Sequence, residues 1–82
     1  MSESLIEHAY YVLESSSNDI LNRIWDYVES TRNHMCMYKT RLGHAGTIRW
    51  VIEMPKDKLE SYFLLQFASY VSSIDKPNYY IY

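Results

Sequence analysis

The chain has 82 residues, of which 48% are hydrophobic and 22% charged, with a formal net charge of −2. This length predicts one domain, residues 1–82, with a modest core, and the apolar and aromatic content excludes a disordered chain. The single cysteine, Cys36, excludes an intrachain disulfide. The longest apolar run, residues 62–71, covers about half of a membrane span, and the first residues lack the basic segment of a signal peptide. We therefore expect a cytosolic protein without membrane insertion.

The charges are distributed unevenly along the sequence. Residues 1–31 carry six acidic side chains and one basic one, whereas residues 32–49 carry four basic side chains and no acidic one. The remainder is close to neutral. The chain therefore has an acidic first part and a basic middle, and each part favours a partner of the opposite charge.

Two early stretches have apolar residues at helical spacing. The first, about Leu5–Glu14, begins with the capping-box spacing of Ser4 and Glu7. The second, about Asp19–Thr31, follows the segment SSSND, whose serine or asparagine supplies the cap. Both have one apolar stripe and an outward acidic face. These features predict two amphipathic helices that form a helical hairpin.

From His34 the apolar period changes to two. The segments MCMYKTR and TIRWVIEM are typical of strands, and the glycines of the intervening LGHAG permit a tight turn. Closing this loop as a β-hairpin pairs Tyr38 with Trp50 and places both on the core face. A shift of one residue brings Lys39 to the core face instead, so we expect the first register.

This register gathers Lys39, Arg41 and Arg49 on the other face of the hairpin. It also sets Lys39 opposite Arg49, a like-charge pair that costs stability. Either this register is wrong, or the basic face has an anionic neighbour that relieves the repulsion. The basic face is then a candidate docking surface for an acidic partner, and the alternative is an ordinary solvated face.

The segment Asp57–Ile74 predicts a long third helix. Asp57 and Glu60 have the capping-box spacing, and one apolar stripe runs along the segment. A surface helix needs only that stripe to pack on a core. The helix is therefore expected to be central, or to cover a partner with a second and weaker apolar face that consists of Tyr62, Leu65 and Ala68.

The tail DKPNYYIY follows a Pro-Asn turn and is expected to form a short strand beside the hairpin, or an aromatic arm over the core. Nine tyrosines exceed what a small core can bury, so a subset is expected at an interface: Tyr11, Tyr62, Tyr79, Tyr80 and Tyr82. The predicted fold class is α+β, with a helical hairpin, a β-hairpin, a long third helix and a short C-terminal strand.

The sequence shows no pattern of catalytic or cofactor chemistry. His34, Cys36 and His44 lack the spacing and the fourth ligand of a zinc site, and no Gly-rich phosphate loop occurs. We expect no enzyme, no cofactor and no metal. The alternative function is that of a small nucleic-acid-binding or transcription-modulating phage protein that uses the basic hairpin, although the aromatic residues there are expected on the face opposite the charges.

The opening MSESLIEHAYYVLESS, the stretch NRIWDYVESTRNHMCMYKTRLGHAG and the length together resemble the accessory lysis-inhibition proteins of T-even bacteriophages, the rapid-lysis III family of small cytoplasmic antiholins. The resemblance implies a protein without catalysis that binds the cytosolic part of the phage holin. It also implies action with a separate periplasmic antiholin to delay host lysis, and a place in the host cytoplasm, peripheral to the inner membrane through the holin.

The resemblance supplies no binding motif, so the partner-binding residues are predicted from their physical properties. Charge and exposure select Lys39, Arg41, Arg49, Tyr62, Leu65, Tyr79, Tyr80 and Tyr82. The second apolar face of the third helix and the surplus tyrosines also favour a homodimer.

Overall fold

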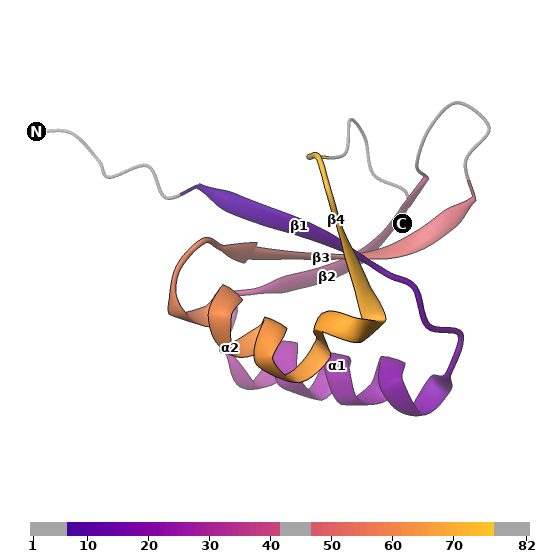
Figure 1. The fold of residues 1–82 in the computed structure, drawn as a ribbon, viewed down its shortest axis with the longest axis horizontal. Coiled ribbons are helices and arrows are strands. Elements are labelled where there is room, and N and C mark those ends of the chain that lie inside the picture. Colours follow the sequence, from indigo (N-terminus) through magenta and orange to yellow (C-terminus); the bar gives the residue numbers. More distant parts are fainter. Residues whose placement is uncertain (1–6, 42–46, 77–82) are drawn as a thin grey trace, which may run out of the picture.

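The structure is a computed structural model that describes residues 7–41 and 47–76. Within these ranges the chain forms β1 (His8–Leu13), α1 (Asn18–Ser30), β2 (Cys36–Arg41), β3 (Ile48–Pro55), α2 (Lys58–Phe67), the short 3-10 helix η1 (Ala68–Tyr70) and β4 (Val71–Ile74). The strands form one antiparallel sheet in the order β2-β3-β1-β4, and both helices lie on the same face of it (Figure 1). This β-α-β-β-α-β connectivity is that of ferredoxin-like domains.

The predicted helical hairpin is wrong, because residues 8–13 form a central strand. β1 lies between β3 and β4 and is buried on both faces. Tyr11 on the helix side is 8% exposed, and Val12 on the opposite side is 4% exposed. A strand buried on both faces has a continuous apolar run, and such a run also fits a helical stripe.

The long third helix predicted for Asp57–Ile74 is also wrong. α2 ends at Phe67, and after the turn of η1 the chain runs back along β1 as β4, with Tyr10 opposite Ile74. Val71 and Ile74 are β-branched, and the two serines between them compete with helical hydrogen bonds, so this segment gains more from strand pairing than from further helix. The described residues therefore contain two α-helices rather than three.

The other predicted elements agree with the structure. α1 matches the predicted helix to within one residue at each end, and the Ser17 hydroxyl caps it by accepting the N–H of Ile20 at 3.4 Å. β2 and β3 form the expected hairpin. The C-terminal strand was predicted largely in residues 77–82, which lie outside the described residues.

The register of the hairpin differs from the predicted one by one residue. Lys39 lies opposite Trp50, and Tyr38 lies opposite Val51. Because side chains alternate along a strand, the shift turns β2 over and directs Met37 rather than Tyr38 toward the helices. The core gains an apolar side chain, and Lys39 reaches the helix side only near the end of the strand, where it remains exposed.

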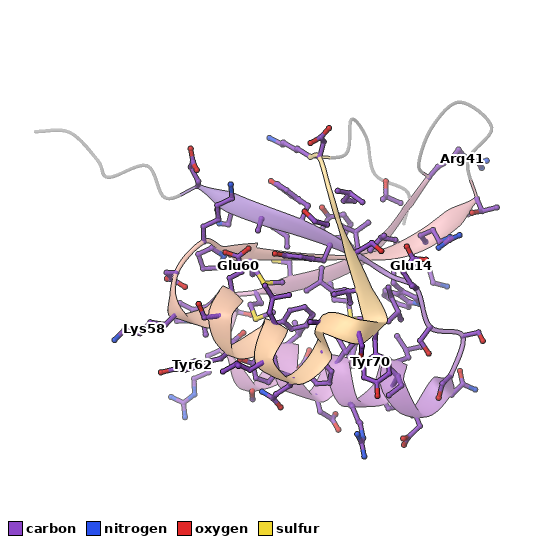
Figure 2. The ribbon with its side chains drawn as sticks, in the orientation of Figure 1. Glu14, Arg41, Lys58, Glu60, Tyr62 and Tyr70 are labelled. Carbon is purple, nitrogen blue, oxygen red and sulfur yellow. The ribbon has the colours of Figure 1, made fainter. Side chains whose placement is uncertain are left out.

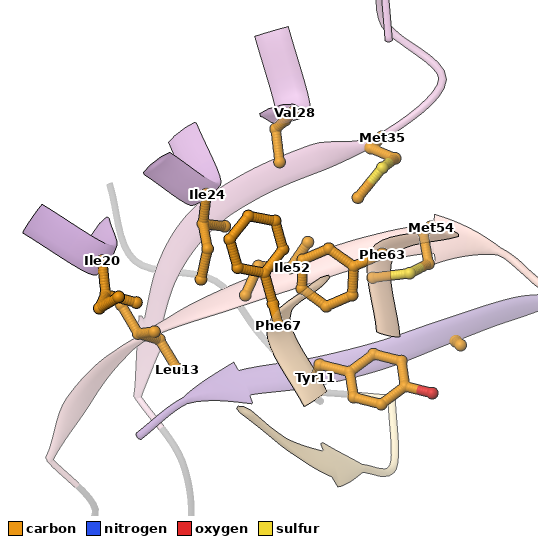
Figure 3. Close-up of a cluster of buried hydrophobic side chains, with 11 residues drawn as sticks. Tyr11, Leu13, Ile20, Ile24, Val28, Met35, Ile52, Met54, Phe63 and Phe67 are labelled. Carbon is orange, nitrogen blue, oxygen red and sulfur yellow. The ribbon is translucent and has the colours of Figure 1, made fainter. Parts of the chain in front are cut away.

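The core lies between the sheet and the two helices (Figure 3). Phe63 of α2 is fully buried at the centre of the core. The centre of its ring lies 6.0 Å from the ring centre of Tyr11 and 5.3 Å from that of Phe67. Burial of this kind is the main source of stability in a domain of this size. The buried cluster comprises Ala9, Tyr11, Leu13, Ile20, Ile24, Val28, Met35, Ile52, Met54, Phe63 and Phe67.

Candidate functional site

A hollow of about 610 Å³ lies where the end of β1 and the following residues 14–16 meet the β2–β3 hairpin. We call it the hairpin hollow. It combines aliphatic, aromatic, cationic and hydroxyl side chains, as a binding site for a polar and partly apolar ligand requires. The lining residues are Leu13, Glu14, Ser15, Ser16, Lys39, Ile48, Arg49 and Trp50.

The aromatic wall of the hairpin hollow is Trp50, which is half-buried. Trp25 of α1 meets it edge-on, with ring centres 5.7 Å apart, and Lys39 Nζ lies 5.1 Å from the Trp50 ring centre. Trp25 is 41% exposed and Ile48 is 48% exposed. Exposed tryptophan beside a cation is a common composition for the energetic centre of a protein interface.

The two cations of the hairpin hollow have different surroundings. Arg49 Nη1 lies 3.3 Å from Glu14 Oε1, an ion pair two residues beyond the last paired residues of β1 and β3, Val12 and Val51. Both side chains are nearly half exposed, so the pair adds little stability. Among the described carboxylates, none lies within ion-pair distance of Lys39. Lys39 is therefore the cation available to a ligand.

The predicted basic face of three residues is wrong, because the observed register divides it. Lys39 and Arg41 share the helix side of β2, whereas Arg49 lies opposite Thr40 on the other face. Arg41 stands at the loop end of the hairpin, away from Glu14 (Figure 2). Lys39 and Arg49 both line the hairpin hollow, from opposite faces of the hairpin. The predicted repulsion between Lys39 and Arg49 does not arise in this register.

The predicted aromatic and apolar site residues are distributed over different surfaces. Tyr62 and Leu65 of α2 are 53% and 82% exposed, as expected for the second face of that helix, and Tyr62 lies on the side of α2 away from the sheet (Figure 2). Tyr11 was expected at an interface and is instead in the core. Tyr79, Tyr80 and Tyr82 lie outside the described residues.

A second hollow, of about 650 Å³, lies between the start of β1, the end of β4 and the start of α2. At its wall the Tyr11 hydroxyl donates a hydrogen bond to Glu60 at 2.5 Å. Burial, and then the hydrogen bond and charge of Glu60, raise the pKa of Tyr11 to about 12. The phenol is therefore protonated at neutral pH and ties β1 to α2. Its role here is structural, because the hydroxyl proton is committed to Glu60.

Within residues 7–41 and 47–76, no three His, Cys, Asp or Glu side chains come together as metal ligands. His34 and Cys36 are exposed, and His44 lies outside the described residues. In the same ranges no helix is long and apolar enough to cross a bilayer.

Sequence reasoning missed several residues of the hairpin hollow. Glu14 was assigned to the end of a helix, and Ile48 to the core face of the hairpin. Reading Ala9–Leu13 as a buried strand would have placed Glu14 beside the basic hairpin and predicted its pairing with Arg49.

Comparisons of the chain with protein-family models, with curated proteins and with solved structures found no match.

Proposed function

We propose that this chain is a non-catalytic regulator that holds a segment of a partner protein in the hairpin hollow. The observation that carries the proposal is Trp50, half-buried beneath the ammonium group of Lys39. An indole ring with a neighbouring cation offers both apolar contact area and a charged hydrogen-bond donor. Exposed Ile48 extends the apolar area at the same rim.

The charges of the hairpin hollow favour an acidic segment with an apolar anchor. Lys39 provides an ammonium group without a described carboxylate nearby. Arg49 is held by Glu14 in an exposed pair, and a partner carboxylate can replace Glu14 at small cost. Complementary charges of this kind accelerate association and select the partner, while the indole contributes most of the affinity.

From the resemblance to the lysis-inhibition family, we propose that the partner is the cytosolic segment of a phage holin. On this proposal the chain acts in the host cytoplasm, at the inner membrane through the holin, and delays lysis together with a periplasmic antiholin. The support is the resemblance of the two quoted sequence stretches and the chemistry of the hairpin hollow, which needs no cofactor.

The test is a titration of the full-length chain with a synthetic peptide of the holin's cytosolic segment, followed by tryptophan fluorescence. Lys39→Glu should raise the dissociation constant by at least about tenfold, because it reverses the charge beside Trp50. Lys58→Glu is the matched control, since Lys58 is an exposed lysine at the start of α2. Equal effects of the two variants would exclude the hairpin hollow as the site.

The nucleic-acid alternative is tested in the same assay with single-stranded DNA. Such binding weakens steeply with salt, with a slope that follows the number of phosphates contacted. The sheet face opposite the helices is a poor platform for base stacking, because Thr40 and Val51 on this face are fully buried. Tight, salt-sensitive DNA binding without peptide binding would replace the protein-binding proposal.

A further inference from the structure

The two outer strands of the described sheet are protected differently against pairing with another chain. β2 carries Lys39 and Arg41, the kind of charged residues by which natural edge strands prevent pairing. β4 has the sequence VSSI, with neither charge nor proline. An edge without such protection is suited to accept a further strand.

The hydrogen-bond pattern shows which groups of β4 face outward. The N–H of Glu14 donates to the carbonyl of Tyr70 at 2.8 Å, and the register then sets Val12 opposite Ser72. Along an antiparallel pair, residues whose backbone N–H and C=O groups face the partner strand alternate with residues whose groups face away from it. Tyr70, Ser72 and Ile74 therefore face β1. The N–H and C=O groups of Val71 and Ser73 therefore point away from β1, and no strand of the described residues pairs with them.

Beyond Glu60, the side of α2 next to this edge also lacks charge. Glu60 reaches Tyr11 on β1, and Leu64 follows Glu60 at a helical spacing of four. Leu64 therefore lies on the side of α2 away from the groove that Gln66 shares with α1. Ala68, the first residue of η1, continues this side, because its N–H donates to the Leu64 carbonyl. From residue 61 to residue 74 the sequence has no charged side chain. Depletion of charge is the compositional signal of an interface centre.

We propose that a second copy of this chain pairs with β4 about a two-fold axis. The two β4 strands run antiparallel, with Ser72 of one copy opposite Ser72 of the other. The Ser73 N–H of each copy donates to the Val71 carbonyl of the other, so the two sheets become continuous. The charge-free surface around Leu64 and Ala68, where α2 passes into η1, extends the contact beside the joined strands.

A second copy fits this surface better than a different protein does. In a two-fold interface the same patch meets itself, so a charged residue near the axis repels its own copy. The β4 edge and the adjacent side of α2 avoid that repulsion, whereas pairing through β2 would bring Lys39 and Arg41 of two copies together. A surface without charge also gives no electrostatic means of selecting an acidic or basic partner.

Sedimentation equilibrium of the full-length chain at micromolar concentrations tests the proposal. Wild type should form dimers, and Ser73→Pro should raise the dimer dissociation constant by at least about tenfold, since it removes one outward N–H from each copy. Ser73→Ala keeps the backbone donor and should dimerise like wild type. A wild type that stays monomeric throughout would overturn the proposal.

Cross-linking provides a second test that does not depend on the proline variant folding. The two Ser72 residues form a non-hydrogen-bonded pair, with Cα atoms about 4.5 Å apart, which fits a disulfide. Ser72→Cys in a Cys36→Ser background should yield covalent dimers on mild oxidation. Wild type, whose exposed Cys36 lies at the other edge, is the control. Equal cross-linking of the two proteins would overturn the proposed pairing.

Discussion

Lys39 lies directly opposite Trp50 in the β2–β3 ladder, and its ammonium group is 5.1 Å from the centre of the indole ring. The aliphatic part of a lysine side chain can cover an apolar ring while its charge stays in water. This contact explains how the hairpin tolerates a lysine on the helix side of the sheet. It also links the register of the hairpin to the composition of the hairpin hollow, because the same pair forms one wall of it.

The contact between Lys39 and Trp50 should have a measurable effect on stability. Lys39→Gln removes the charge while keeping a polar side chain, and should lower the free energy of unfolding by about 0.5–1 kcal/mol. Urea denaturation followed by circular dichroism measures this change. Lys58→Gln, on exposed α2 surface, should leave the midpoint unchanged. Equal losses in both variants would contradict a specific contribution of the ring contact.

The centre of the core is expected to tolerate truncation poorly. Phe63 is fully buried among the rings of Tyr11, Tyr27 and Phe67, so Phe63→Ala should cost about 3–5 kcal/mol through cavity formation. Leu65→Ala on the same helix should cost less than about 0.5 kcal/mol, because Leu65 is 82% exposed. Thermal denaturation of a dilute sample compares the two. A Phe63→Ala protein that melts like wild type would place Phe63 outside the core.

The Tyr11 phenol should make stability depend on alkaline pH. Its pKa is raised from 10.0 to about 12, first by burial and then by Glu60. The stability that the protonated hydroxyl contributes is therefore fully present below about pH 10 and is lost as the pH rises through 12. Absorbance of phenolate between pH 9 and 13 should show late-titrating tyrosine.

Two variants assign that late titration. Tyr11→Phe should remove one late-titrating phenol. A second remains, because burial and then Tyr62 raise the pKa of Tyr27 as well. Glu60→Gln should lower the pKa of Tyr11 only in part, because burial is the larger cause. An unchanged titration curve in Tyr11→Phe would show that this phenol is not the shifted group.

The elements that could be predicted from the sequence are those with one exposed face. α1 has a clear apolar stripe and a serine cap, and the hairpin strands alternate in polarity, so the positions of these elements were predicted closely. β1 could not be recognised in the same way, because a strand covered on both faces has no alternation. β4 was missed because Val71 and Ile74 continue the apolar stripe of α2, and the gain from pairing with β1 is a tertiary effect.

The candidate site was predicted in part. The basic and aromatic residues of the hairpin were identified, but their arrangement depends on a register that the loop between the strands did not determine. The burial of Lys39 was expected to exclude the observed register. A long side chain near the end of a strand avoids the free-energy cost of burying its charge, since the charged group reaches solvent. The error in β1 then hid the contribution of Glu14 to the hairpin hollow.

The hairpin register can be tested with the one native cysteine. Cys36 lies opposite Glu53. The Lys56 N–H donates to the Glu7 carbonyl, so the backbone groups of Lys56 face β1. Because these directions alternate along a strand, the backbone groups of Glu53 face β2, and Cys36 and Glu53 form a hydrogen-bonded pair. Their Cα atoms are therefore about 5.5 Å apart, within the range of a disulfide. In the register expected from the sequence, Cys36 instead faces Ile52.

Glu53→Cys should consequently form an intrachain disulfide on mild oxidation, whereas Ile52→Cys should keep two free thiols. Thiol titration under denaturing conditions and mass spectrometry distinguish the two states.

The disulfide should also stabilise the oxidised Glu53→Cys protein by about 3 kcal/mol relative to its reduced form, because it closes a loop of moderate length in the unfolded chain. Glu53→Ser controls for the loss of the carboxylate next to His8. Efficient disulfide formation in Ile52→Cys and none in Glu53→Cys would restore the register in which Tyr38 faces Trp50, and would return Lys39, Arg41 and Arg49 to one face.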